Sequence, residues 1–64
     1  MGIKLKEARF EARMTQAELA KASGVSRMTI VNIEADKYEN VKIGTLKKLA
    51  KALGKKVMDI FFDE

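Results

Sequence analysis

The chain has 64 residues, enough for one domain (residues 1–64) and close to the lower limit for a hydrophobic core without crosslinks. It contains no cysteine and no histidine, which leaves out disulfides and the usual zinc sites. It also has no carboxylate pair in a recognisable setting, so acid–base and nucleophilic catalysis lack their usual residues. Thirteen basic and nine acidic side chains give a net charge of +4, which favours a polyanionic partner. We therefore expect no enzymatic activity, no metal and no cofactor.

The first predicted element is a helix over residues 3–13. This segment is rich in helix-forming residues, and Leu5, Ala8 and Ala12 fall on one stripe at helical spacing. The stripe predicts the face that this helix turns toward the core.

A second helix is expected over residues 15–22. Thr15 is followed three positions later by Glu18, the pattern of a capping box at a helix N-terminus. Met14 and Leu19 stand where a hydrophobic staple closes over such a start. The helix therefore begins at a well-marked position.

A third helix follows after a tight turn, over residues 26–35. Gly24 stands just past the second helix, where glycine often supplies the left-handed residue that stops a helix. Ser26 is a good N-cap, with Val25 and Ile30 as its staple. Two short helices joined by such a turn form a helix-turn-helix, here at about residues 15–35, a motif whose second helix enters the major groove of DNA.

The two faces of this third helix differ in chemistry. Ile30 and Ile33 lie on the side expected to be buried. The other side carries Arg27, Met28, Val31 and Asn32. An arginine can pair with guanine, an asparagine with adenine, and an apolar side chain can touch a thymine methyl group. The alternative is an ordinary surface helix with scattered apolar residues.

A polar loop is predicted over residues 36–42, followed by a fourth helix that ends at Gly54. The apolar stripe of that helix consists of Leu46, Leu49, Ala50 and Leu53. The last segment, 57–62, is predicted as a short helix or as an edge strand, because six residues do not settle the period. The whole pattern predicts an all-α fold, a compact bundle of four to five helices.

Lysines are concentrated in the second half of the chain. No carboxylate lies between Asn40 and Met58, a stretch that contains Lys42, Lys47, Lys48, Lys51, Lys55 and Lys56. These lysines form either a solvated surface or a set of phosphate contacts.

The chain resembles the lambda Cro/cI family of helix-turn-helix domains, also known as the xenobiotic-response-element type. The resemblance covers nearly the whole chain and is strongest in Thr-Gln-Ala-Glu-Leu-Ala (15–20) joined to Gly-Val-Ser (24–26) at the family's spacing. It continues through residues 5–9, 30, 33–34 and 45–54. It implies a lambda repressor-like DNA-binding fold.

The resemblance also implies roles for individual residues. Base reading is implied for Arg27, Met28 and Asn32. Contacts to DNA phosphates are implied for Gln16, Thr29, Lys37, Tyr38 and Lys42. Gln16 is also implied to support the third helix. A buried or half-buried salt bridge between Arg9 and Glu34 is implied as a tie between the first and third helices.

The chain departs from the family pattern at three places. Where the family usually has glycine after the third helix, the chain continues Ala35-Asp36, so the reversal must be made without glycine. Asp36 and Glu39 bring negative charge near the expected phosphates. Lys56 stands at the usual Ser or Thr cap of the last helix.

We therefore expect a sequence-specific DNA-binding transcriptional regulator, a repressor that binds a palindromic operator as a homodimer. Phe61 and Phe62 cannot easily both be buried, so they are the candidates for the dimer surface, with Phe10 as a further unassigned aromatic residue. The alternative is that these aromatic residues complete a very small core, and this is the preferred interpretation for Phe61. The alternative function is the antitoxin of a toxin–antitoxin pair that also binds its own operator. No segment suits a membrane span or a signal peptide, so a cytoplasmic, nucleoid-associated protein is expected. No small-molecule effector is evident.

Overall fold

The computed structural model describes residues 4–37 and 41–61. Five helices follow one another in this part of the chain: α1 (Leu5–Glu11), α2 (Gln16–Ser23), α3 (Arg27–Glu34), α4 (Ile43–Ala52) and α5 (Val57–Phe61). The all-helical fold is therefore confirmed. The last segment is helical over 57–61, so the strand alternative is wrong there.

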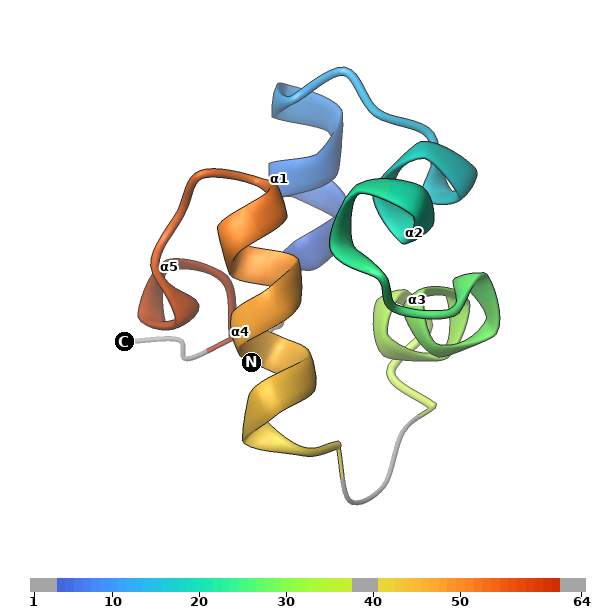
Figure 1. Cartoon of the computed structure of the whole chain (residues 1–64), viewed down its shortest axis with the longest axis vertical. Helices are drawn as coiled ribbons and strands as arrows, with labels where there is room; N and C mark the ends of the chain where they lie inside the picture. The colour runs from blue at the N-terminus through green and yellow to red at the C-terminus, as the bar shows by residue number, and fades with distance from the viewer. Residues whose placement is uncertain (1–3, 38–40, 62–64) are drawn as a thin grey trace.

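In Figure 1, α4 stands in the middle of the view, with α5 on one side and α2 and α3 on the other. Helix α2 packs against both α3 and α4, α5 packs against α4, and α1 packs against α3 and α5. The backbone N–H of Lys4 donates to the carbonyl of Ile60 at 2.7 Å, which joins the start of α1 to α5. No helix in the described ranges is long and apolar enough to cross a membrane.

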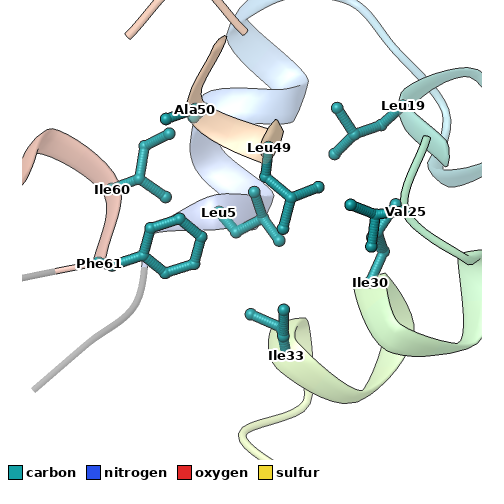
Figure 2. Packing of buried hydrophobic residues seen from close by; sticks show 10 residues of the cluster. Leu5, Leu19, Val25, Ile30, Ile33, Leu49, Ala50, Ile60 and Phe61 are labelled. Atoms are coloured by element: carbon teal, nitrogen blue, oxygen red, sulfur yellow. The ribbon is translucent and has the colours of Figure 1, made fainter. Parts of the chain in front are cut away.

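Every helix contributes at least one side chain to a single core (Figure 2). The largest side chains with less than 2% exposure are Leu5, Leu19, Ile30, Ile33, Leu49 and Ile60. Burial of each such side chain contributes about 1.5–3 kcal/mol. The core is therefore built from a few aliphatic residues at the predicted stripe positions.

One expectation about the core is wrong. Ala12 is exposed and caps the end of α1 rather than extending its buried stripe. Phe61 is only 8% exposed, and Figure 2 shows its ring directed into the cluster beside Leu5, so it completes the core, which is the interpretation preferred for it from the sequence. Phe62 lies outside the described residues.

The caps predicted from the sequence are formed at the starts of α2 and α3. The Glu18 N–H donates to Thr15 Oγ1 at 3.0 Å, and the Thr15 N–H donates to Glu18 Oε1 at 2.8 Å, which completes the capping box. The Thr29 N–H donates to Ser26 Oγ at 3.1 Å. These bonds satisfy backbone donors that would otherwise lack partners and fix where each helix begins.

Four helices end at a residue in the left-handed conformation: Arg13 (φ 59°), Gly24 (φ 78°), Asp36 (φ 58°) and Gly54 (φ 67°). After Gly24 the chain enters the turn that joins α2 to α3. Its N–H donates to the carbonyl of Ala20 at 2.9 Å, the single bond of an αL cap.

Asp36 makes the reversal after α3 that a glycine makes in the family pattern. Its N–H donates to the carbonyl of Ile33 at 3.1 Å, and the Lys37 N–H donates to the carbonyl of Asn32 at 2.8 Å. This pair of bonds is a Schellman motif. Aspartate is one of the few residues other than glycine that enter the left-handed region at modest cost, because its short polar side chain can bond locally.

Substitution by alanine is expected to change stability in opposite directions at Gly24 and Gly44, because only Gly24 of the two has a left-handed backbone conformation. Gly24→Ala is expected to destabilise the fold by about 1 kcal/mol, because the left-handed conformation costs an L-residue roughly 1–2 kcal/mol and the stiffer unfolded chain returns only part of this. Gly44→Ala is the matched control, since Gly44 lies inside α4. A Cβ meets nothing within 4 Å at either glycine, so neither substitution causes a clash. Gly44→Ala is expected to stabilise the fold by about 0.5 kcal/mol, because alanine loses less conformational entropy than glycine when it enters a helix. Urea unfolding measures the change in stability for both variants. Changes of the same sign would contradict the left-handed conformation assigned to Gly24.

Candidate nucleic-acid interface

Helix α3 has one buried and one open side, as its sequence predicts. Ile30 and Ile33 are 0% and 1% exposed and face the core. On the other side Arg27 is exposed, Met28 is 66% exposed and Asn32 is half-buried. The guanidinium, thioether and carboxamide are thus available on one short helix.

The N-terminal turn of α3 is closed by two hydroxyl groups. Ser26 Oγ accepts the N–H of Thr29 and donates to Thr29 Oγ1 at 2.8 Å. Thr29 is half-buried, so its hydroxyl lies at the edge of the open side of α3. This local network holds the first turn in place, next to Arg27 and Met28.

Arg9 and Glu34, the pair implied by the resemblance, form a bidentate salt bridge between α1 and α3. Arg9 Nε donates to Glu34 Oε2 at 2.7 Å, and Arg9 Nη2 donates to Glu34 Oε1 at 3.0 Å. Their side chains are 7% and 5% exposed. The pair therefore lies out of solvent, where the geometry of an arginine fork is well matched to a carboxylate.

The pair makes two further contacts whose partners were not predicted from the sequence. Arg9 Nη1 donates to the carbonyl of Met14 at 2.8 Å, which ties down the segment between α1 and α2. Gln16 Nε2 donates to Glu34 Oε1 at 3.0 Å, which joins the start of α2 to the end of α3. A contact with a backbone carbonyl leaves no signal in the sequence, and the resemblance implied that Gln16 supports the third helix without naming its partner. The four residues form one network across three helices.

The network shifts the pKa values of its two charged members. Burial by itself raises the pKa of Glu34, but the hydrogen bonds from Arg9 and Gln16, with the positive charge of Arg9, lower it below its ordinary value. The hydrogen bond to Glu34 raises the pKa of Arg9, although desolvation opposes this. Both residues are therefore charged at neutral pH.

The lysines lie on the outside of the molecule. Exposed members are Lys37, Lys42, Lys47, Lys48, Lys51, Lys55 and Lys56. Lys42 is the N-cap residue of α4, whereas Lys55 follows the opposite end of that helix. Lys55 Nζ also pairs with Glu11 Oε1 at 3.2 Å. Tyr38, the other loop residue expected at phosphates, lies outside the described residues.

Comparison with known proteins agrees with this geometry. Residues 5–60 match the profile of a helix-turn-helix family. The chain belongs to the Cro/cI-type helix-turn-helix family. The match spans all five described helices, so the family includes the whole bundle and not only the motif itself.

Several relatives of this helix-turn-helix protein are similar over most of its length. An uncharacterized HTH-type transcriptional regulator of Archaeoglobus fulgidus is 46% identical over 65 residues, which cover 100% of this chain and 90% of the relative. One of Methanocaldococcus jannaschii is 47% identical over 62 residues, covering 95% and 91%. An immunity repressor protein of Bacillus phage phi105 is 38% identical over 64 residues, covering 100% of this chain but 44% of the repressor.

The Arg9–Glu34 network predicts how stability depends on pH. Because the pKa of Glu34 is lower in the folded state, its contribution is complete well above the unfolded-state value of about 4.3 and is lost as the pH falls through the folded-state pKa. Glu34→Gln is therefore expected to destabilise by about 3 kcal/mol at pH 7, and the difference from the natural protein should shrink with acidification.

Urea unfolding at a series of pH values measures this difference. Glu11→Gln is the matched control, because it removes a carboxylate from an exposed pair and should change stability by less than about 0.5 kcal/mol. A Glu34→Gln effect that is small at pH 7, or that grows as the pH falls, contradicts the assignment.

Proposed function

We propose that this helix-turn-helix protein is a DNA-binding transcriptional regulator that places α3 in the major groove of a duplex. The observation that carries the proposal is the open side of α3, where Arg27, Met28 and Asn32 project from a helix whose other side is fixed in the core. Relatives with the names of transcriptional regulators and of a phage repressor support it. A major groove admits one α-helix of this size.

In the proposed complex two groups of residues have different tasks. Arg27, Met28 and Asn32 read base edges. Contacts with phosphates position the protein and come from Gln16, Thr29, Lys37, Tyr38 and Lys42. The net charge of +4 supports such contacts.

We further propose that the protein acts as a homodimer and a repressor. A single module of this size reads few base pairs, and each mismatch costs only about 1–3 kcal/mol. Two copies on half-sites one helical turn apart double the recognised sequence, and the operator is then palindromic. Selection of random-sequence duplexes with the purified protein tests the proposal, since it should yield one palindromic site. Recovery of no preferred sequence would overturn it.

Arg27 is expected to contribute to specificity. Arg27→Ala should lose roughly 1–3 kcal/mol on the selected site and relax the preference at one base position. Titration of the selected duplex and of its single-base variants measures this. An equal loss on every sequence would make Arg27 a phosphate contact instead.

Lys42 is expected to contribute to affinity on all sequences. Lys42→Ala should weaken binding evenly and flatten the dependence of log K on log salt by about one unit. Lys55→Ala is the matched control, since it removes the same charge at the opposite end of α4. A salt slope that Lys42→Ala leaves unchanged would remove Lys42 from the interface.

A further inference from the structure

We propose that Glu34 is a positioning residue for DNA binding, which orients the amide of Gln16 so that its second N–H is directed at a backbone phosphate. The inference rests on the proposed function, because it explains how the phosphate contact of Gln16 is made. Glu34 does not touch DNA in this scheme. It acts through Gln16.

The chemistry of the two groups fixes the polarity of the amide. Gln16 Nε2 lies 3.0 Å from Glu34 Oε1. A carboxylate only accepts hydrogen bonds, whereas a glutamine amide has two N–H donors at one end and a carbonyl acceptor at the other. The nitrogen end of Gln16 must therefore face Glu34. One N–H is used in that contact, and the other remains for an acceptor such as a phosphate oxygen.

The carboxylate is itself held rigidly. Arg9 donates to both oxygens of Glu34, and the third nitrogen of Arg9 is anchored on the carbonyl of Met14. The Glu34 side chain is only 5% exposed, so water has little access to it. A fixed acceptor restricts the rotamers of Gln16 before DNA arrives, which lowers the entropy lost on binding.

The hydrogen bond between Gln16 and Glu34 also couples the proposed phosphate contact of α2 to the proposed base contacts of α3. Gln16 is the first residue of α2, and Glu34 is the last residue of α3. A phosphate donor on one helix is thereby held in register with the helix that carries Arg27 and Asn32. The buried ion pair thus has a role beyond holding α1 against α3.

The test must separate this role from stability, because removing one member of a buried pair leaves an uncompensated charge. The variant Arg9→Met/Glu34→Met removes both charges, leaves the net charge at +4 and fills the site with apolar side chains, a replacement that is often neutral or stabilising. We expect it to fold and to bind the selected duplex about tenfold more weakly, the value of one hydrogen bond to a charged acceptor.

A thermodynamic cycle identifies the route of the effect. Gln16→Ala in the natural protein should cause about the same tenfold loss, and adding Gln16→Ala to the double variant should cause no further loss. Arg9→Met/Glu34→Gln is the matched control, because its amide carbonyl again offers Gln16 an acceptor. It is expected to recover most of the affinity without restoring the ion pair.

Nuclear magnetic resonance of the natural protein provides a readout that needs no variant. Gln16 is the only glutamine in the sequence, so its side-chain amide is distinguished from those of the asparagines. Its amide protons should show contacts to the Glu34 side chain both free and bound to DNA, and one proton should shift on binding. An amide that leaves Glu34 in the complex overturns the inference.

The outcomes also distinguish this inference from the proposed function. If Gln16→Ala weakens binding tenfold but the Met/Met variant binds like the natural protein, Glu34 has no positioning role. If Arg27→Ala weakens binding and Gln16→Ala does not, the phosphate contact of Gln16 is wrong and the inference falls with it. If the natural protein prefers no duplex, the proposed function itself is wrong.

Discussion

The packing of the helix-turn-helix against α1 depends on positions 9 and 34, where the structure places a buried, bidentate ion pair between Arg9 and Glu34. It joins α1 to α3, and its further bonds to Met14 and Gln16 include the entry to α2. A chain of 64 residues has a total stability of only about 3–10 kcal/mol. The loss of one member of a buried pair, about 3–5 kcal/mol, is comparable with that total. A charge at one of these positions without its partner is therefore enough to unfold much of the protein, whereas the pair as a whole adds little net stability.

The core and the network have complementary tasks in this arrangement. Ile30 and Ile33 fix which side of α3 is buried, because any rotation of the helix would expose them. Aliphatic contacts tolerate small sliding movements, whereas a bidentate bond has a narrow range of distance and direction. Glu34 at the end of α3 therefore defines the position of the helix along its axis. The open side of α3 is presented in one orientation only.

Local signals in the sequence were sufficient to predict most of the fold. The capping box at Thr15 and the N-cap at Ser26 are made by residues three positions apart, so sequence spacing reveals them. The stripe of α4 was also readable. The error at Ala12 has a local cause, because α1 ends in a Schellman motif whose left-handed residue is Arg13, a residue type that gives no such signal.

Contacts between residues far apart in the sequence could not be predicted from local patterns. Arg9 and Glu34 are separated by 25 positions, and the pair was expected only through the family resemblance. Phe61 was a candidate both for the core and for a dimer surface, because composition does not tell which of two adjacent aromatic residues enters the core. In the structure its ring completes the cluster beside Leu5, on a helix that packs against α4 and α1. How a short helix packs against distant parts of the chain is not set by its local pattern.

Asp36 meets a requirement of the backbone and at the same time adds a negative charge that the backbone does not need. The Schellman motif after α3 needs a left-handed residue, which glycine supplies without a charge and aspartate supplies with one. The backbone therefore does not require the carboxylate. In the proposed complex an exposed negative charge next to Lys37 opposes the attraction of phosphates, and this effect is the same on every sequence. Because this effect is equal on every sequence, it lowers the affinity for DNA and leaves the difference in binding free energy between sites, which comes from the base contacts of α3, unchanged.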